Sequence, residues 1–217
     1  MTGLMIAAIE GRSEIIKLLV SHSTNNQHTD DMGFNALTLA VTAHHIHDDT
    51  ITLLLQHLNT ADINTALSKA AGAGQVDNLT VLLQHADTSG KNTALCVAAD
   101  AGHLSVVSTL LCEGADVNTK HTSSGYTPLI FAAMYGHTEV ARTLLAHHAH
   151  IDTQDTEGGT VLTYASMWGY KDLVLLLLDH QANTSLRDKD GRTALSWAQL
   201  CHHTDIVQIL EQHTNTV

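Results

Sequence analysis

The stretch that decides the fold runs from Thr127 to Leu145 and reads TPLIFAAMYGHTEVARTLL. Thr127 can cap the start of a helix, and Pro128 stands one residue later, where a helix tolerates proline best. Gly136 supplies the left-handed residue that ends this first helix. A second helix follows, with an apolar stripe at helical spacing formed by Val140, Leu144 and Leu145. The stretch therefore predicts one helix-turn-helix unit.

Six other stretches of the chain align with this one. They begin at Thr2, Asn35, Thr65, Thr93, Thr160 and Thr193, so that successive units start 33, 30, 28, 34, 33 and 33 residues apart. One unit alone cannot bury its apolar face, whereas stacked units share a continuous core. We therefore predict a single all-α domain over residues 1–217, a solenoid of seven helix-turn-helix repeats. The repeats, called units one to seven, cover approximately residues 1–29, 30–59, 60–87, 88–121, 122–154, 155–187 and 188–217.

These units resemble the ankyrin repeat family. The resemblance is carried by the pattern T-x-L-x-x-A-A-x-x-G-H at residues 93–103 and 127–137, and by LLCEGADVN at residues 110–118. A D-x-x-G-x-T turn also occurs at residues 155–160 and 188–193. In that family the connection between units forms a β-hairpin finger, so the resemblance implies short β-hairpin fingers between some of the repeats.

Several units depart from the family pattern. The connections before Thr65 and Thr93 are five or six residues shorter than the others, so we expect no finger there. His44 and His202 stand where glycine usually ends the first helix, and a left-handed residue other than glycine costs on the order of 1 kcal/mol. Units two and seven should therefore be less regular. Unit one has no polar capping helix before it, which favours a fragment of a longer protein with an exposed apolar flank.

Composition and motifs exclude several classes of function. The chain has 10 Lys and Arg against 22 Asp and Glu, a net charge of −12, so it lacks the basic patch that nucleic acids require. No apolar run approaches the roughly 18 residues that a membrane span needs. A GxSxG elbow, a glycine-rich phosphate loop, HExxH and CxxC are all absent from the sequence. We therefore predict no enzyme, no cofactor and no metal site. Three cysteines and no signal-like start favour a reducing, cytoplasmic location.

Histidine is unusually frequent, with 17 residues. Six histidines occupy one repeat-equivalent position near the end of the second helix, and this histidine column comprises His22, His57, His85, His147, His180 and His213. An imidazole there can bond the free carbonyls of the helix end, so the column is interpreted as structural. A pH- or metal-responsive element is the alternative, because imidazole suits transition metals and local clusters occur at residues 44–47, 147–150 and 202–203.

Ankyrin proteins bind partners in a concave groove lined by the fingers and by the two residues before the turn glycine. Carried onto this chain, the resemblance implies partner-binding residues in units five to seven, namely Tyr126, Met134, Tyr135, Glu157, Met167, Trp168 and Arg192. Aromatic residues and arginine dominate interface hot spots, and methionine adapts to irregular shapes. The matching positions of units three and four hold only Gly72, Ala73, Asp100 and Ala101, and Trp197 is expected in the core.

The sequence thus predicts a monomeric, non-catalytic scaffold that recognises a partner protein. Two alternatives stay open at this point. The chain could be the targeting module of a larger protein or a host-directed bacterial effector delivered into a host cell. It could also be a pH- or metal-responsive element that uses the histidine column.

Overall fold

The computed structural model describes residues 1–22, 29–30, 34–42 and 48–216. Within these residues the secondary structure consists of fourteen helices, and no strand is found. The odd-numbered helices form an inner row: α1 (Gly3–Ile9), α3 (Ala36–Thr42), α5 (Thr60–Gly72), α7 (Thr88–Ala101), α9 (Pro128–Met134), α11 (Val161–Trp168) and α13 (Ala194–Leu200). The even-numbered helices form an outer row: α2 (Ser13–His22), α4 (Asp48–Leu55), α6 (Val76–Leu83), α8 (Leu104–Cys112), α10 (Thr138–Ala146), α12 (Lys171–Asp179) and α14 (Thr204–Thr216).

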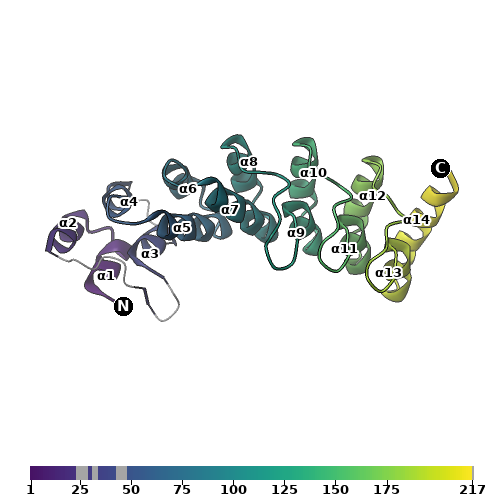
Figure 1. Ribbon diagram of the computed structural model, residues 1–217, viewed down its shortest axis with the longest axis horizontal. Coiled ribbons are helices and arrows are strands. Elements are labelled where there is room, and N and C mark those ends of the chain that lie inside the picture. The colour runs from purple at the N-terminus through teal and green to yellow at the C-terminus, as the bar shows by residue number, and fades with distance from the viewer. Residues whose placement is uncertain (23–28, 31–33, 43–47, 217) are drawn as a thin grey trace.

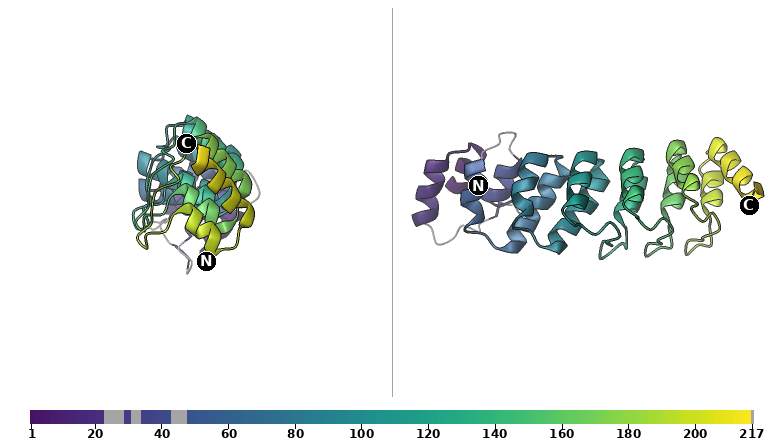
Figure 2. Two further views of the ribbon diagram at one scale, coloured as in Figure 1. Left: turned by 90° about the vertical axis from the view of Figure 1, so that its right-hand side faces the viewer. Right: turned by 90° about the horizontal axis from the view of Figure 1, so that it is seen from above.

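The helices stack in chain order into one elongated body. Each inner helix contacts the next inner helix, each outer helix contacts the next outer helix, and the two helices of a pair contact each other. In Figure 1 the outer helices lie along the upper edge, and the inner helices lie along the lower edge with the loops that precede them. Figure 2 shows the same elongated stack from above and from one end. The predicted all-α class is confirmed.

One continuous apolar core runs the length of this stack, from Met5 to Leu210. Alanines are fully buried on the inner row, where neighbouring helices must approach closely, as at Ala66, Ala98, Ala132 and Ala165. Leucines such as Leu79, Leu110 and Leu144 fill the space between the rows. Unit one also exposes Ile6, Ile15 and Leu18, in agreement with the expected apolar flank.

The predicted threonine caps hold in four units and fail in two. The side chains of Thr2, Thr127, Thr160 and Thr193 each accept a hydrogen bond from the backbone N–H three residues later. Thr65 and Thr93, however, lie inside helices rather than at their starts. Helix α5 begins earlier, capped by Asn59, and helix α7 begins earlier, capped by Asp87. The short connections of units three and four are thus absorbed into inner helices of 13 and 14 residues, against 7 in α9.

Loops rather than strands occupy the places of the expected fingers. The loops before α9, α11 and α13 are each closed by a backbone hydrogen bond, from His121 to Tyr126 (2.8 Å), Asp155 to Gly159 (3.0 Å) and Asp188 to Arg192 (3.0 Å). We call these loops finger five (residues 121–126), finger six (155–159) and finger seven (188–192). The α4–α5 and α6–α7 connections contain only residues 56–59 and 84–87. The β-hairpin form of the fingers is therefore not confirmed.

The turn between the two helices of a pair carries a ladder of hydrogen bonds between units. Gly102 adopts a left-handed conformation with φ of 75°, and His202 adopts it with φ of 62° despite its side chain, as expected for unit seven; His44 lies outside the described residues. The residue after the turn reaches back to a carbonyl at the end of the preceding inner helix. His137 does so with its Nε2 atom 3.0 Å from the Asp100 oxygen. The other rungs join His103 to Gly72, Tyr170 to Met134 and His203 to Met167.

Candidate functional site

Three aromatic side chains lie at the same position of successive inner helices, four residues after the capping threonine. They are Phe131 on α9, Tyr164 on α11 and Trp197 on α13, each half-buried. Each of these rings contacts the finger that precedes its own helix. The inner row therefore presents an aromatic floor beneath fingers five to seven.

A single carboxylate fixes each of the last two fingers. One oxygen of Asp155 accepts hydrogen bonds from the backbone N–H groups of Glu157 (2.7 Å) and Gly159 (3.0 Å). The other oxygen accepts the hydroxyl of Tyr164 at 2.6 Å. Burial, together with the hydrogen bonds to Asp155 and Tyr126, raises the pKa of Tyr164 far above its ordinary value. The phenol therefore stays protonated and continues to donate to the finger.

Finger seven repeats this arrangement with different residues. The Oδ1 atom of Asp188 accepts the backbone N–H groups of Asp190 (3.0 Å) and Arg192 (2.8 Å), and Oδ2 accepts the indole N–H of Trp197 at 2.7 Å. Burial opposes ionisation of Asp188, but the hydrogen bonds from Arg192, Trp197 and Asp190 and the charge of Arg192 hold its pKa below the ordinary value. The Arg192 guanidinium lies 4.9 Å from the Trp197 ring and pairs with Asp190.

The three fingers are also bonded to one another. The backbone N–H of Thr156 in finger six donates to the Ser124 carbonyl of finger five at 3.0 Å. The backbone N–H of Lys189 in finger seven donates to the Glu157 carbonyl at 2.9 Å, and the two side chains form an exposed ion pair at 3.3 Å. Because these bonds follow one register, fingers five to seven form a continuous hydrogen-bonded row, which we call the finger row.

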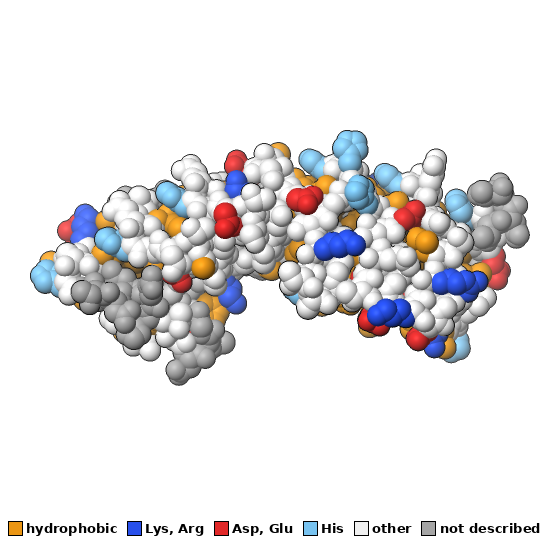
Figure 3. Space-filling model, viewed as in Figure 1, with side chains coloured by type: hydrophobic (Ala, Val, Ile, Leu, Met, Phe, Trp, Pro, Cys, Tyr) orange, Lys and Arg blue, Asp and Glu red, His pale blue; other side chains and the backbone are white. Residues whose placement is uncertain are grey.

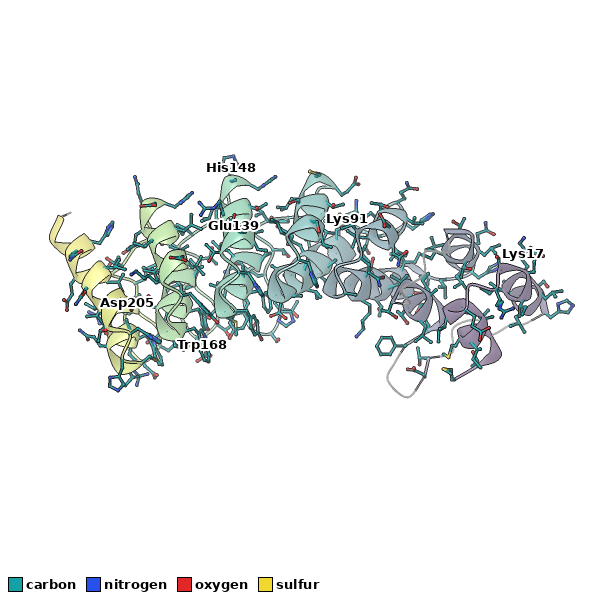
Figure 4. The ribbon with its side chains drawn as sticks, turned by 180° about the vertical axis from the view of Figure 1, so that it is seen from behind. Lys17, Lys91, Glu139, His148, Trp168 and Asp205 are labelled. Atoms are coloured by element: carbon teal, nitrogen blue, oxygen red, sulfur yellow. The ribbon has the colours of Figure 1, made fainter. Side chains whose placement is uncertain are left out.

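The C-terminal ends of inner helices α9 and α11 border this surface on the side opposite the finger row. Tyr135 at the end of α9 and Trp168 at the end of α11 are both 55% exposed. Figure 4 shows Trp168 at the lower edge of the molecule, beside the last turn of α11. Met134 and Met167, one residue earlier, are half-buried, and their backbone carbonyls accept the ladder bonds from Tyr170 and His203.

The structure brings two of the predicted site residues together in one hollow and places the others around it. Glu157 and Met167 line one hollow of about 260 Å³ with Tyr164, Lys189 and Trp197. Tyr126 does not project as a free anchor but packs edge-on against Phe131 (5.4 Å) and Tyr164 (5.8 Å). Tyr135 and Trp168 are exposed at equivalent positions of neighbouring units, and we call this pair the aromatic ridge. Arg192 covers the indole of Trp197.

The sequence of this stack matches the model of a known protein family. A family model for ankyrin repeats in three copies matches residues 1–66, 47–121, 67–155 and 129–216. The chain belongs to the ankyrin repeat family. Ankyrin repeats are in general non-catalytic modules of protein–protein interaction. A comparison with curated protein sequences gives no match to this chain. Among the described residues of this ankyrin chain, no helix has the length and apolar character that a membrane crossing requires.

Sequence reasoning missed the aromatic floor of this ankyrin surface. Trp197 was expected in the core, and that prediction is wrong: its ring is half-buried under finger seven and lines the hollow beside Tyr164. The signal that could have revealed the floor is the strict 33-residue spacing of Phe131, Tyr164 and Trp197. An aromatic residue at one repeat position in three consecutive units indicates a shared environment rather than three separate core contacts.

A second hollow, of about 560 Å³, lies between helix α7 and the start of finger five. We call it the α7 cavity; it is lined by Ser89, Asn92, Thr93, Cys96, Val97, Asp100, Thr119, Lys120, His121, Thr122 and Phe131. Burial raises the pKa of the Cys96 thiol to about 12, so this cysteine is not a nucleophile at neutral pH. Burial also raises the pKa of the Asp100 carboxyl, while the nearby His137 acts in the opposite direction.

The histidine column lies on the opposite side of the ankyrin stack. The Nδ1 atoms of His22, His147 and His180 lie 2.8, 2.9 and 2.9 Å from the carbonyl oxygen four residues earlier. Because a carbonyl can only accept, each ring nitrogen donates to a carbonyl of the last helical turn. Each of these carbonyls also accepts a second hydrogen bond, from the Ser21 hydroxyl at Leu18 and from the histidine's own backbone N–H at Thr143 and Leu176. Figure 3 shows histidines along the upper edge, where Figure 4 labels His148. In the described part of the chain no three His, Cys, Asp or Glu residues are placed to hold a metal; the predicted cluster at residues 44–47 lies outside it.

Proposed function

We propose that this ankyrin chain is a non-catalytic scaffold that binds a partner protein on the concave side of units five to seven. The observation that supports this most is the exposure of two large aromatic rings, Tyr135 and Trp168, on the border opposite the hydrogen-bonded finger row. An anchor held on a rigid element loses little entropy on binding, which leaves more of its contact energy available for affinity. Tyr126, Met134, Glu157, Met167 and Arg192 belong to the same proposed surface.

The charges of this surface favour specificity over simple electrostatic attraction. Lys189 pairs with Glu157, and Arg192 pairs with Asp190, so the finger tips carry both signs of charge and are exposed. Rim charges of this kind influence partner choice and association rate more than affinity. A partner therefore needs an apolar or aromatic centre with complementary charges at the level of the fingers.

The architecture that carries this function is proposed as one domain of seven repeats. The alternation of inner and outer helices over the described residues supports this count, and the hydrogen-bonded loops support a finger role for residues 121–126, 155–159 and 188–192. Three free cysteines support action inside a reducing compartment. The carbonyl bonds of His22, His147 and His180 support a structural role for these three members of the histidine column.

Affinity capture with matched variants tests the proposal. Trp168→Ala removes an exposed ring from the concave side, and Leu175→Ala removes an exposed side chain, 40% accessible, from outer helix α12. Truncating a central anchor costs about 2 kcal/mol or more, so Trp168→Ala should weaken a partner at least tenfold, whereas Leu175→Ala should not. Circular dichroism checks that both variants fold. If both variants retain every partner with wild-type affinity, the aromatic ridge is not the binding surface.

A further inference from the structure

The row of fingers has a free edge at its N-terminal end. Neighbouring fingers are joined by one kind of backbone hydrogen bond, in which Thr156 donates to the Ser124 carbonyl and Lys189 donates to the Glu157 carbonyl. In each case the donor lies four residues before the capping threonine of its own unit, and the acceptor lies three residues before the capping threonine of the preceding unit. The equivalent donor in finger five is Ser123. Among the described residues, the Ser123 N–H has no main-chain partner. Unit four has no finger to accept it, because the residues that would form that finger belong to helix α7. The finger row therefore ends with an unused donor position.

The α7 cavity lies at this edge, where the missing finger would stand. Its apolar part is formed by Cys96, Val97 and Phe131, and its polar part includes the exposed Thr93 and Thr122. Figure 3 shows a notch in the lower edge of the molecule near this junction. A volume of about 560 Å³ falls within the ~300–1,000 Å³ typical of ligand pockets, which is enough for a few residues of a peptide.

The charges at the cavity indicate what it would select. Asp100 lines the wall, and within the described residues no ion pair engages its carboxylate. The His137 imidazole, which bonds the Asp100 backbone oxygen, also acts electrostatically on the Asp100 carboxyl, but in the described part of the chain the two side chains form no ion pair. Lys120 also lines the cavity, but its Nζ atom lies 3.5 Å from the Gln154 carbonyl in the next connection, and among the residues that the structure describes it forms no ion pair with Asp100. A partly buried carboxylate that no salt bridge engages favours a cationic group in the ligand.

We propose that the α7 cavity binds an extended, Lys- or Arg-containing segment of a partner protein, which takes the place of the missing finger and accepts the Ser123 N–H. The proposal deepens the proposed function, on which it rests, by naming a second contact and the chemistry of its ligand. Addition of an extended segment to a free edge supplies affinity through main-chain hydrogen bonds and specificity through side-chain pockets. Here an apolar ligand side chain packs on Val97 and Phe131, and the cation pairs with Asp100.

A displayed library of random linear peptides, selected on the wild-type protein, provides the probe. Thr93→Trp fills the cavity from an exposed position, and Thr65→Trp makes the same change at the matching exposed position of unit three, which does not line it. Asp100→Asn removes the charge alone. Selected peptides should be rich in Lys or Arg, bind Thr65→Trp normally, and lose at least tenfold in affinity with Thr93→Trp and with Asp100→Asn. The Ser123 amide proton resonance should move downfield when a peptide binds.

The outcomes separate this inference from the proposed function. Peptides that bind Thr93→Trp and Asp100→Asn at wild-type affinity, or a library that yields no binder, would overturn the inference. If the binders depend on Trp168 instead, the aromatic ridge binds protein as proposed but the cavity does not. If Trp168→Ala and Thr93→Trp change the affinity of neither the captured proteins nor the peptides, both proposals fail.

Discussion

Replacing Gly102 by alanine tests the ladder that joins unit four to unit five. The residue has φ of 75°, a conformation that costs an L-residue roughly 1–2 kcal/mol. The new Cβ would also lie 2.5 Å from Cε1 and 2.9 Å from Cγ of His137, so the whole imidazole must move. That movement breaks the bond between Nε2 and the Asp100 carbonyl, now 3.0 Å long, which is worth about 1 kcal/mol net. We expect a total loss of about 2–3 kcal/mol.

Gly114 provides the matched control for this substitution. It has φ of 83°, but a Cβ added there would meet no atom within 4 Å, so Gly114→Ala should lose only the backbone contribution of roughly 1–2 kcal/mol. Urea unfolding measures both losses, provided that the slopes stay equal to that of the wild type. Adding His137→Ala to Gly102→Ala should cost less than the sum of the two single changes. Equal losses for Gly102→Ala and Gly114→Ala would refute the reasoning.

Two other predictions follow from the ionisable groups at the α7 cavity. Because burial raises the folded-state pKa of Asp100, its charged form opposes folding. Asp100→Asn should therefore be at least as stable as the wild type at pH 7. Any gain in the free energy of unfolding should shrink as the pH falls through the folded-state pKa toward the unfolded-state pKa of about 3.9. Urea midpoints at several pH values check this, and a clear loss at pH 7 would contradict it. The exposed Cys112 should react with a thiol reagent in the native protein, whereas the buried Cys96, with its raised pKa, should react only after unfolding; equal native rates would show that α7 opens readily.

The regular part of the fold could be predicted because each repeat carries its own local signals. Thr127, Pro128 and Gly136 specify one helix start and one helix end by local chemistry, and the structure confirms them. The prediction that Thr65 and Thr93 start helices failed. Aligning the repeats matches these threonines to Thr127, but it does not show that the helices of units three and four begin earlier in the chain. Asn59 and Asp87 are better capping residues placed earlier in the chain, and they start longer helices.

The candidate site was only partly predictable for a related reason. Tyr135 and Trp168 could be predicted to be exposed because the family resemblance assigns the positions just before the turn glycine to the groove surface. The α7 cavity exists because a unit without a finger lies beside a unit with one, a difference between neighbours that no single repeat contains. Likewise, the indole of Trp197 is drawn toward finger seven by the carboxylate of Asp188, a contact between a loop and a helix that helical periodicity does not encode.

Hydrogen–deuterium exchange of the protein alone and with a captured partner tests the central claim most directly. If the concave side of units five to seven binds the partner, backbone amides of the finger row, in residues 121–126, 155–159 and 188–192, and of the C-terminal turns of α9 and α11 should exchange more slowly in the complex. Amides of the outer helices α8, α10 and α12 should be unchanged. Protection confined to those outer helices, with an unprotected finger row, would contradict the account.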